Sequence, residues 1–439
     1  MSEQKNTQDK IPTSKISRAG RFVKTGFKVG GNYAKHYAKK LVNGEADKDA
    51  LDQKNAEDIY ESLSTMKGSA LKVAQMLSMD KGALPAAYAN QFSQAQHKAP
   101  PLSGPLIVKT FRKYFGKSPS DLYDKFEMQA AHAASIGQVH RAFKGDKTLA
   151  VKIQYPGVGD SVLSDLKIVR PIARRMFGWK DSEIEIYFEE VKARLVEETD
   201  YDLELERSQF ISEKAAHIPN LVFSNYYPDL SCDRIISMDW LDGLHMDEFL
   251  ETNPSQEIRD SIGQALWDFY NFQVHELRIM HADAHPGNFL FRQDGSVGIL
   301  DFGCVKEISD SFYKSYFKLL NPKVLEDDDA FLEGARAAQI ILDSDTPKEI
   351  ATYSEIFREA LQMVTKPFHA DNFDFGDEVF FDAIYEFGDR MGRNPAMRNS
   401  APRGDKDGLY MNRAYFGLFS ILNKLKAKVE TKRYMPAFD

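Results

Sequence analysis

Between residues 11 and 44 the chain mixes apolar and basic positions and contains no acidic residue. The apolar positions that keep helical spacing are Val23, Phe27, Tyr33, Tyr37 and Leu41. The basic positions are Lys15, Arg18, Arg21, Lys24, Lys28, Lys35, Lys39 and Lys40. Because Gly30 and Gly31 interrupt the spacing and glycine weakens a helix, the pattern predicts two short amphipathic helices rather than one.

A basic amphipathic arm of this kind suits an anionic membrane surface, where each nearby Lys or Arg adds roughly 1 kcal/mol. A solvated arm whose aromatic residues pack on the body of the protein fits the same sequence. We therefore expect residues 1–55 to form a basic amphipathic N-terminal arm, with an anionic membrane surface as one candidate partner.

A longer helix is predicted from Ala56 to Met79, because apolar residues alternate four and three positions apart. The apolar stripe consists of Ile59, Leu63, Met66, Ala70, Val73 and Leu77. Lys72 and Gln75 lie off this stripe, one turn apart, so they project together from one flank of the helix. On its own such a pair is an ordinary polar face.

The hydrophobic period then changes to two. Alternation from Leu149 to Tyr155 predicts a half-buried strand that ends at Pro156. Lys152 lies on the less apolar face of this strand. A long acidic helix is predicted from Ile184 to Phe210, and after Ser261 the pattern is mainly helical with one hairpin. These elements predict an α+β fold with a small mixed lobe and a larger helical lobe.

The segment with the most chemistry is His-Ala-Asp-Ala-His-Pro-Gly-Asn, followed by an Asp-Gly pair between apolar runs and then by Asp-Phe-Gly. Asp-Gly in this setting predicts a tight hairpin. If Asp294 and Gly295 form a two-residue turn, Asn288 faces Asp301 at the open end of the ribbon. An amide oxygen and a carboxylate at that position suit Mg²⁺. Asp283 would reach the same place as a base or as a group that orients a nucleophile.

This set of residues fits phosphoryl transfer, which needs Mg²⁺, an aspartate beside the attacking oxygen and a lysine on the phosphates. Lys152 supplies the lysine, and Glu198 on the predicted acidic helix is the candidate that positions its ammonium group. A lone lysine strand or a lone Asp-Phe-Gly is a weak signal, but their combination with the hairpin is specific. The alternative is a transition-metal site with His281, Asp283 and His285 as ligands.

In this order, the residues resemble the UbiB/ADCK/AarF family of protein kinase-like proteins, from about Glu57 to the C-terminus. The resemblance implies a two-lobed protein kinase-like fold with an N-terminal helical extension. It implies that Lys152 binds phosphate, that Glu198 and Asp200 form the family's ExD motif, and that Met238 begins the hinge that contacts adenine. It also implies an alanine-rich loop in place of a glycine-rich one. The nucleotide-binding residues of this region would be Ala133, Ala134, Ser135, Gly137, Gln138 and Val139.

The same resemblance implies a catalytic role for Asp283 and makes Asn288 and Asp301 the Mg²⁺ ligands. Lys72 lies where the family carries its KxGQ motif, on a helix folded over the active site, although alanine replaces the glycine of that motif here. The chain departs from the pattern a second time at His132, where an alanine usually stands. The residues that would gate the site are Lys72, Gln75, Asp200 and Arg413.

Composition limits the function classes. A count of 57 basic against 65 acidic residues gives a net charge of -8, which indicates no general affinity for nucleic acid. Two distant cysteines, Cys232 and Cys304, support neither a disulfide framework nor a thiolate zinc site. We find no signal peptide and no apolar run near the ~20 residues of a membrane span. We therefore expect a cytoplasmic protein, either free or peripheral to a membrane.

The expected organisation is a basic arm at 1–55, a helical extension at 56–118, a kinase-like small lobe at 119–237 and a mainly helical large lobe at 238–439. Only a short segment separates Gly303 from Ser309, which is expected to open a helix. This spacing leaves no room for the long activation segment that would hold a peptide substrate. Protein phosphorylation is therefore disfavoured.

The expected function is an ATPase or phosphotransferase that binds ATP or ADP with Mg²⁺. The resemblance implies a role in isoprenoid quinone, or ubiquinone-type, lipid biosynthesis, so an isoprenoid lipid is a second candidate partner. The alternative from another class is a nucleotide-binding pseudokinase that serves as a scaffold for a membrane-associated enzyme complex. The sequence indicates no oligomeric state.

Overall fold

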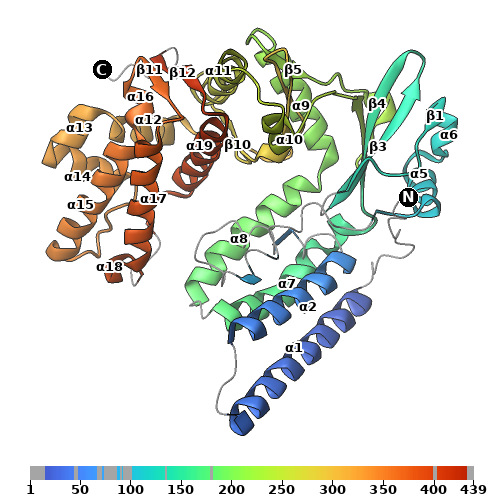
Figure 1. Ribbon diagram of the computed structural model, residues 1–439, viewed down its shortest axis with the longest axis horizontal. Coiled ribbons are helices and arrows are strands. Elements are labelled where there is room, and N and C mark those ends of the chain that lie inside the picture. Colours follow the sequence, from blue (N-terminus) through green and yellow to red (C-terminus); the bar gives the residue numbers. More distant parts are fainter. Residues whose placement is uncertain are drawn as a thin grey trace. The chain divides into compact units, whose positions relative to one another are not determined.

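The computed structural model describes residues 15–43, 48–66, 72–73, 87–88, 91, 101–133, 136–177, 181–398 and 403–432. Within these ranges the chain forms two compact units, which are coloured by sequence in Figure 1. Unit 1 draws its residues from Met1–Glu206 and Asn225–Trp240, and unit 2 from Arg207–Ser224 and Leu241–Asp439. Both units combine helix and sheet, as the sequence pattern predicts.

A five-stranded antiparallel sheet forms the centre of unit 1. Its strands are β1 (Lys125–Phe126), β2 (His132–Ala133), β3 (Gly137–Lys144), β4 (Lys147–Gln154) and β6 (Ile235–Asp239). The predicted strand from Leu149 to Tyr155 corresponds to β4 and is confirmed. One face of the sheet packs against α5 (Gly104–Phe115), where Ile107 and Phe111 are fully buried with Val151.

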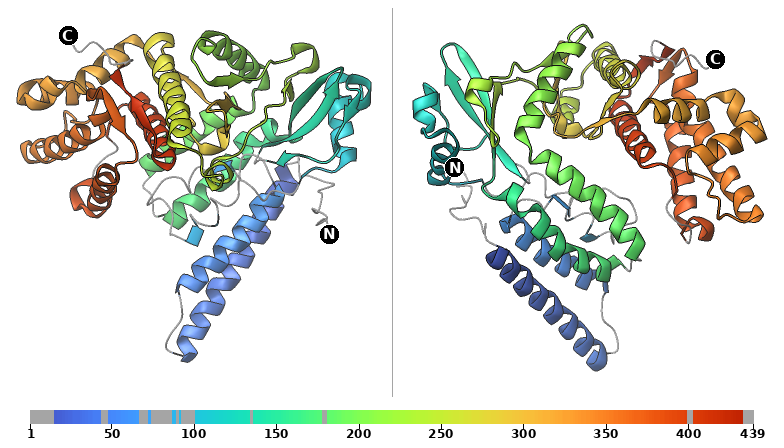
Figure 2. Two further views of the ribbon diagram at one scale, coloured as in Figure 1. Left: turned by 45° about the horizontal axis from the view of Figure 1, so that its top comes forward. Right: turned by 180° about the vertical axis from the view of Figure 1, so that it is seen from behind.

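The N-terminal arm forms one helix, α1 (Lys15–Asn43), which packs alongside α2 (Lys48–Met66), as Figures 1 and 2 show. The predicted break at Gly30 and Gly31 is therefore wrong. The second helix begins before its predicted start at Ala56. Residues 67–71 and 74–79 of that predicted helix lie outside the described ranges.

Polar side chains hold α1 to α2 on both sides of the glycine pair. Lys28 Nζ donates to Asp58 Oδ1 at 3.1 Å, and Asn32 Nδ2 donates to Asp58 Oδ2 at 2.8 Å. These contacts offset the low helix propensity of two glycines, which is roughly 1 kcal/mol each. The helix is therefore held by tertiary contacts where its local sequence is weakest.

The predicted acidic helix from Ile184 to Phe210 is two helices. α8 (Asp181–Glu198) ends before Thr199, and α9 (Tyr201–Ala215) begins two residues later. Asp200 Oδ1 accepts a hydrogen bond from Leu203 N at 3.1 Å, which is the N-cap arrangement. This cap places the acidic residues on either side of it on different helices.

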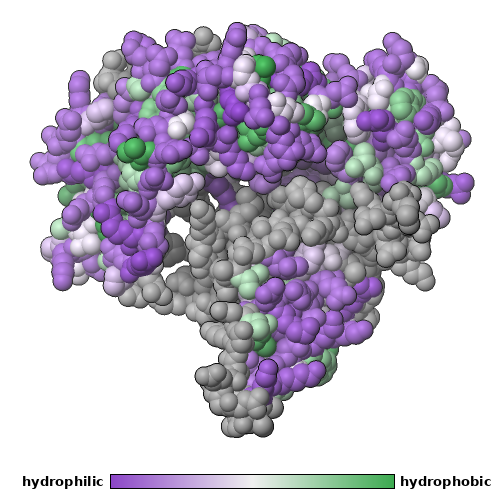
Figure 3. Space-filling view, in the orientation of Figure 1, coloured by the Kyte–Doolittle hydropathy of each residue, from purple (hydrophilic) through white to green (hydrophobic). Residues whose placement is uncertain are grey.

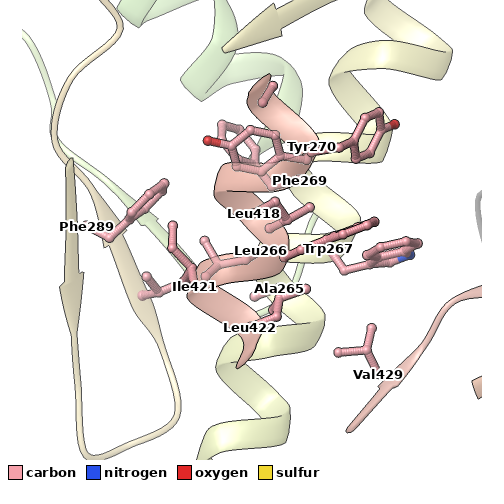
Figure 4. Packing of buried hydrophobic residues seen from close by; sticks show 14 of the residues in the cluster. Ala265, Leu266, Trp267, Phe269, Tyr270, Phe289, Leu418, Ile421, Leu422 and Val429 are labelled. Carbon is pink, nitrogen blue, oxygen red and sulfur yellow. The ribbon is translucent and has the colours of Figure 1, made fainter. Parts of the chain in front are cut away.

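The core of unit 2 forms where α11 (Gln256–Phe272) packs against α19 (Lys406–Leu425), as Figure 4 shows. Leu266 and Phe269 of α11 and Leu418 and Leu422 of α19 are fully buried. A three-stranded sheet lies beside them, consisting of β5 (Leu221–Phe223), β9 (Val297–Ile299) and β8 (Phe289–Phe291).

The other elements connect or cover these two centres. Further helices of unit 1 are α6 (Pro119–Leu122), α7 (Val158–Phe177) and the short η2 (Pro228–Leu230). The remaining helices of unit 2 are α10 (Met246–Glu251), η3 (Gln273–Leu277), η4 (Pro286–Asn288), α12 (Asp310–Leu319), α13 (Pro322–Glu326), α14 (Asp328–Ala337), α15 (Pro347–Val364), α16 (Lys366–His369), α17 (Glu378–Arg393) and α18 (Pro395–Arg398). The remaining strands are β7 (Ile279–His281), β10 (Val305–Glu307), β11 (Asn372–Asp374) and β12 (Lys428–Glu430).

Candidate active-site residues

Lys152 on β4 forms an ion pair with Glu204 on the first turn of α9. The distance from Lys152 Nζ to Glu204 Oε1 is 2.5 Å, and the two side chains are only 17% and 5% exposed. The ammonium group also lies 5.1 Å from the centre of the Tyr201 ring. Burial and a negative partner therefore fix the direction of the lysine, which is what a phosphate-binding lysine needs.

Glu198, which we predicted to be the partner of Lys152, instead pairs with Lys72. Lys72 Nζ lies 2.8 Å from Glu198 Oε1, and both side chains are largely buried. The prediction placed Glu198 and Glu204 on one helix, whereas the cap at Asp200 separates them. Asp200 itself is exposed, and its described role is to begin the helix that carries Glu204.

Sequence reasoning missed Glu204, although the chain contained the signal for it. Aspartate is a common N-cap residue, so Asp200 could have been taken as the start of a helix. Glu204 would then have fallen in the first turn of that helix, close to the strand that carries Lys152.

The alanine-rich loop is the connection between β2 and β3. Ala133 pairs with Gln138 across the two strands, so this pair closes the loop. Ala134 and Ser135 lie outside the described ranges. At Gly137 an added Cβ would lie 2.8 Å from the main-chain oxygen of Ile153, so only glycine fits at this approach of β3 to β4.

The side chain of Gln138 points into the protein interior, contrary to its predicted nucleotide-binding role. The side chain is 1% exposed and accepts a hydrogen bond from Leu102 N at 2.8 Å. Its Nε2 lies 2.7 Å from Nε2 of His140, whose Nδ1 lies 2.8 Å from the carbonyl oxygen of Glu127. His140 therefore donates from Nδ1 and accepts at Nε2, and burial lowers its pKa. Gln138 anchors the base of the loop from inside the protein.

Val139 and Met238 share a sheet face with Lys152. Val139 lies directly opposite Lys152 on β3, and Met238 on β6 lies opposite Ala150, two residues from Lys152 on β4. Cross-strand partners project from the same face of a sheet, and side chains alternate along each strand. This face therefore presents two apolar side chains next to the ammonium group, an arrangement suited to a base beside its phosphates.

In unit 2 the hairpin differs by one residue from the predicted register. Phe289 pairs with Ile299 and Phe291 with Val297, and Leu300 N donates to the carbonyl oxygen of Asn288 at 3.0 Å. Asn288 therefore lies opposite Leu300, and the prediction that it faces Asp301 is wrong.

The cause is a three-residue loop of Gln293, Asp294 and Gly295, closed by the hydrogen bond from Arg292 N to Ser296 O. Gly295 has a φ of 82°, the left-handed conformation that ends this class of hairpin loop. Asp294 Oδ1 accepts from Ser296 N at 2.9 Å and stabilises the turn.

Asp283 and Asn288 come together at the end of this hairpin. Asn288 Nδ2 donates to the main-chain oxygen of Asp283 at 3.0 Å and to its Oδ2 at 3.2 Å. This arrangement directs the amide nitrogen to Asp283 and leaves the amide oxygen for a cation. Asp301 Oδ1 accepts from Gly303 N at 2.7 Å, which fixes the orientation of its carboxylate. Amide and carboxylate oxygens are ligands that Mg²⁺ prefers.

The alternative transition-metal site is not formed. Both ring nitrogens of His281 are engaged: Nε2 lies 2.7 Å from the carbonyl oxygen of Asp301, and Nδ1 lies 3.1 Å from the hydroxyl of Tyr270. His285 Nδ1 accepts from Gly287 N at 3.0 Å. Among the described residues no group of three or more His, Cys, Asp or Glu side chains is placed to hold a metal ion. His281 is instead a support for the backbone at Asp301.

The predicted gating residues divide between the two units. Lys72 lies in unit 1 and is helical, whereas Arg413 lies half-buried on α19 in unit 2. Gln75 lies outside the described ranges. Helix α12 begins at Asp310 with Ser309 as its N-cap, so the predicted helix start close behind Gly303 is confirmed. Within the described ranges, none of the helices combines the length and apolar character that crossing a membrane requires.

The fold and these residues define a protein of the kinase-like class. The sequence matches the ABC1 atypical kinase-like domain over residues 94–334, more than half of the chain. The protein therefore belongs to the ABC1 atypical kinase-like family, in agreement with the predicted resemblance to UbiB proteins.

Several relatives share this similarity. The chain is 29% identical over 357 residues to the probable serine/threonine-protein kinase abkA of Dictyostelium discoideum, covering 75% of this chain and 62% of the relative. It is 29% identical to the mitochondrial atypical kinase COQ8B of Rattus norvegicus, covering 85% and 71% of the two chains. For the mitochondrial atypical kinase COQ8 of Saccharomyces cerevisiae the identity is 26%, with coverage of 97% and 85%.

A solved structure has the same fold. The complex of Rv3197 with erythromycin, from Mycobacterium tuberculosis, superimposes with a TM-score of 0.61 at 25% identity, and covers 89% of this chain and 97% of that one. The predicted kinase-like fold class is confirmed by this similarity.

Proposed function

We propose that the protein is a Mg²⁺-dependent ATPase or phosphotransferase. The observation that carries the proposal is the arrangement of Asp283, Asn288 and Asp301 in unit 2. Hydrogen bonds fix the orientation of each of these side chains, and each would have a different role. Unit 1 supplies the buried pair of Lys152 and Glu204.

Each group would have one role in phosphoryl transfer. Lys152, held by Glu204, would bind the phosphates of ATP or ADP. The amide oxygen of Asn288 and the carboxylate of Asp301 would hold Mg²⁺, which neutralises phosphate charge when bound. Asp283 would orient the attacking oxygen of water or of a substrate hydroxyl.

Phosphate release by the purified full chain with Mg-ATP tests this proposal. The wild type is expected to release phosphate, and Asp301→Asn is expected to lower the rate by at least about 100-fold, as loss of a charged metal ligand implies. Replacing His285 with Gln is the matched control, because this residue lies in the same loop without a metal-ligand role. An active Asp301→Asn variant, or a wild type that neither hydrolyses nor transfers phosphate, would refute the enzymatic proposal.

The second candidate is a nucleotide-binding scaffold of the pseudokinase type. It is favoured by the small side chains of the loop at Ala133, since a loop without successive glycines covers phosphates less closely. Tight binding of Mg-ATP without phosphate release or transfer would support the scaffold.

We also propose that the enzyme works at an anionic membrane surface and, as the UbiB resemblance suggests, in isoprenoid quinone synthesis. The physical support is that α1 packs its polar side on α2 and turns apolar side chains outward: Val23, Phe27 and Tyr37 are 59%, 77% and 59% exposed. Lys24 and Lys35 are exposed on the same helix. Figure 3 shows hydrophobic residues among hydrophilic ones on this part of the surface. A bilayer interface accommodates both kinds of side chain.

Binding to vesicles tests the membrane role. Vesicles with anionic lipid are expected to bind the wild type, and Phe27→Ser should weaken that binding several-fold. Val379→Ser is the matched control, because Val379 is 78% exposed on α17, far from α1 in sequence. Equal effects of the two substitutions, or equal binding to neutral vesicles, would contradict an oriented role for α1.

A further inference from the structure

Helix α19 meets the loop that follows Asp283, residues 284–288, at Gly417. A Cβ added to Gly417 would lie 2.5 Å from the main-chain oxygen of Ala284 and 2.6 Å from its Cβ. Ala284 follows Asp283 directly. We infer that Gly417 is a positioning residue. Because it has no side chain, the loop can lie directly on α19, and this contact fixes the position of the Asp283 carboxylate.

The helix cannot move away from the loop without breaking the core of unit 2. Leu418, Ile421 and Leu422, which follow Gly417, are fully buried, and Figure 4 shows them packed against α11. The hydroxyl of Tyr415 donates to Asn271 Oδ1 of α11 at 3.1 Å. Any added volume at position 417 must therefore be accommodated by the loop.

The loop in turn transmits such a movement to Asp283. The carbonyl oxygen of Asp283 accepts hydrogen bonds from His285 N at 2.8 Å and from Asn288 Nδ2 at 3.0 Å. On the other side, Ala282 N donates to Cys304 O at 2.9 Å. Because Ala284 lies between these anchors, a shift of its peptide turns the neighbouring carboxylate rather than only bulging the loop.

The size of the shift follows from the contacts. To bring the Ala284 oxygen from 2.5 Å to an ordinary distance from a methyl group, the peptide must move by about 1 Å or more, which is the scale at which misplacement of a reacting group costs about 100-fold in rate. This inference rests on the proposed phosphoryl-transfer function and adds a residue that touches neither nucleotide nor metal. Arg413 lies one turn earlier on the same side of α19.

The test compares Gly417→Ala with Gly388→Ala in the full chain. Gly388 is helical on α17, and an added Cβ there meets nothing within 4 Å, so this control should keep wild-type turnover. Gly417→Ala is expected to lower the turnover number by about 10- to 100-fold while the dissociation constant for Mg-ATP changes less than about threefold, because Lys152 and its partner are untouched. Thermal unfolding curves identify a temperature at which each variant is folded, and turnover is compared at that temperature.

Wild-type turnover in Gly417→Ala, or a loss that only follows its unfolded fraction, would overturn the inference. The double variant Ala284→Gly/Gly417→Ala lacks one of the two close contacts, so its turnover should lie above that of Gly417→Ala, and an equal rate would contradict the packing argument. If the wild type releases no phosphate, the proposed function is refuted, but the inference about Gly417 is not. Amide hydrogen exchange from residue 283 to 288 then tests the inference: faster exchange in Gly417→Ala supports it and unchanged exchange refutes it.

Discussion

Replacing Glu204 with Gln should disable Lys152, the lysine that we propose binds phosphate, whereas the same change at Glu198 should not. Glu204 is 5% exposed and lies 2.5 Å from Lys152 Nζ. A hydrogen bond to a charged group contributes about 1.5–3 kcal/mol, so loss of the negative charge should weaken Mg-ATP binding by roughly 10- to 150-fold. Glutamine keeps the shape of the side chain, which limits changes in packing.

Calorimetric titration with Mg-ATP separates the two residues. Glu198→Gln breaks the pair with Lys72 and leaves the pair of Lys152 and Glu204 in place, so the affinity should stay within about threefold of the wild type. Circular dichroism checks that both variants are folded. If Glu198→Gln weakens binding and Glu204→Gln does not, the assignment of partners is refuted.

Three further predictions concern stability. Arg18 forms a bidentate pair with Asp165 on α7 in which both side chains are almost fully buried, so Arg18→Met should cost about 3–5 kcal/mol and increase proteolysis of α1. Burial lowers the pKa of His275 to about 4, below its unfolded value near 6.5. The free energy of unfolding should therefore keep its full value above pH 6.5 and fall by about 3 kcal/mol as the pH drops toward 4. Urea unfolding of His275→Phe should show a smaller fall. Gly295→Ala places a side chain at a φ of 82° and should cost about 1 kcal/mol, measured by the urea midpoint, against no loss for Gly388→Ala.

The hairpin shows what local sequence can and cannot predict. The Asp-Gly pair correctly predicted a turn, and the apolar runs correctly predicted its strands. The sequence did not decide between a two-residue and a three-residue loop, because Asp-Gly suits both. The side chain of Asp294 and the left-handed Gly295 select the longer loop, and this single residue changes the partner of Asn288 from Asp301 to Leu300.

Two further corrections have different causes. The Glu198 prediction failed because a capping residue was included in a helix, although the signal at Asp200 was local and could have been used. The Gly30 prediction failed because the contacts that hold α1 together come from Asp58 on another helix. No local pattern contains that information, since tertiary contacts override propensity.

Gln138 shows the same limit for a site residue. A glutamine next to a predicted phosphate-binding loop is chemically suited to bind a ligand. The sequence does not show whether its side chain points toward that ligand or into the protein interior. The hydrogen bonds to Leu102 and His140 that bury it join segments far apart in the chain. The kinase-like class itself was predictable, because it rests on Lys152 and on motifs with fixed local spacing.

The most direct test of the central claim is the dependence of ATP binding on Mg²⁺, measured by calorimetry on the full chain. The account predicts one ATP per chain, bound tightly only with Mg²⁺, and an affinity at least about tenfold weaker in Asp301→Asn and in Lys152→Met. Absence of ATP binding by the wild type, or binding that is unchanged by removing Mg²⁺ and by both substitutions, would contradict it.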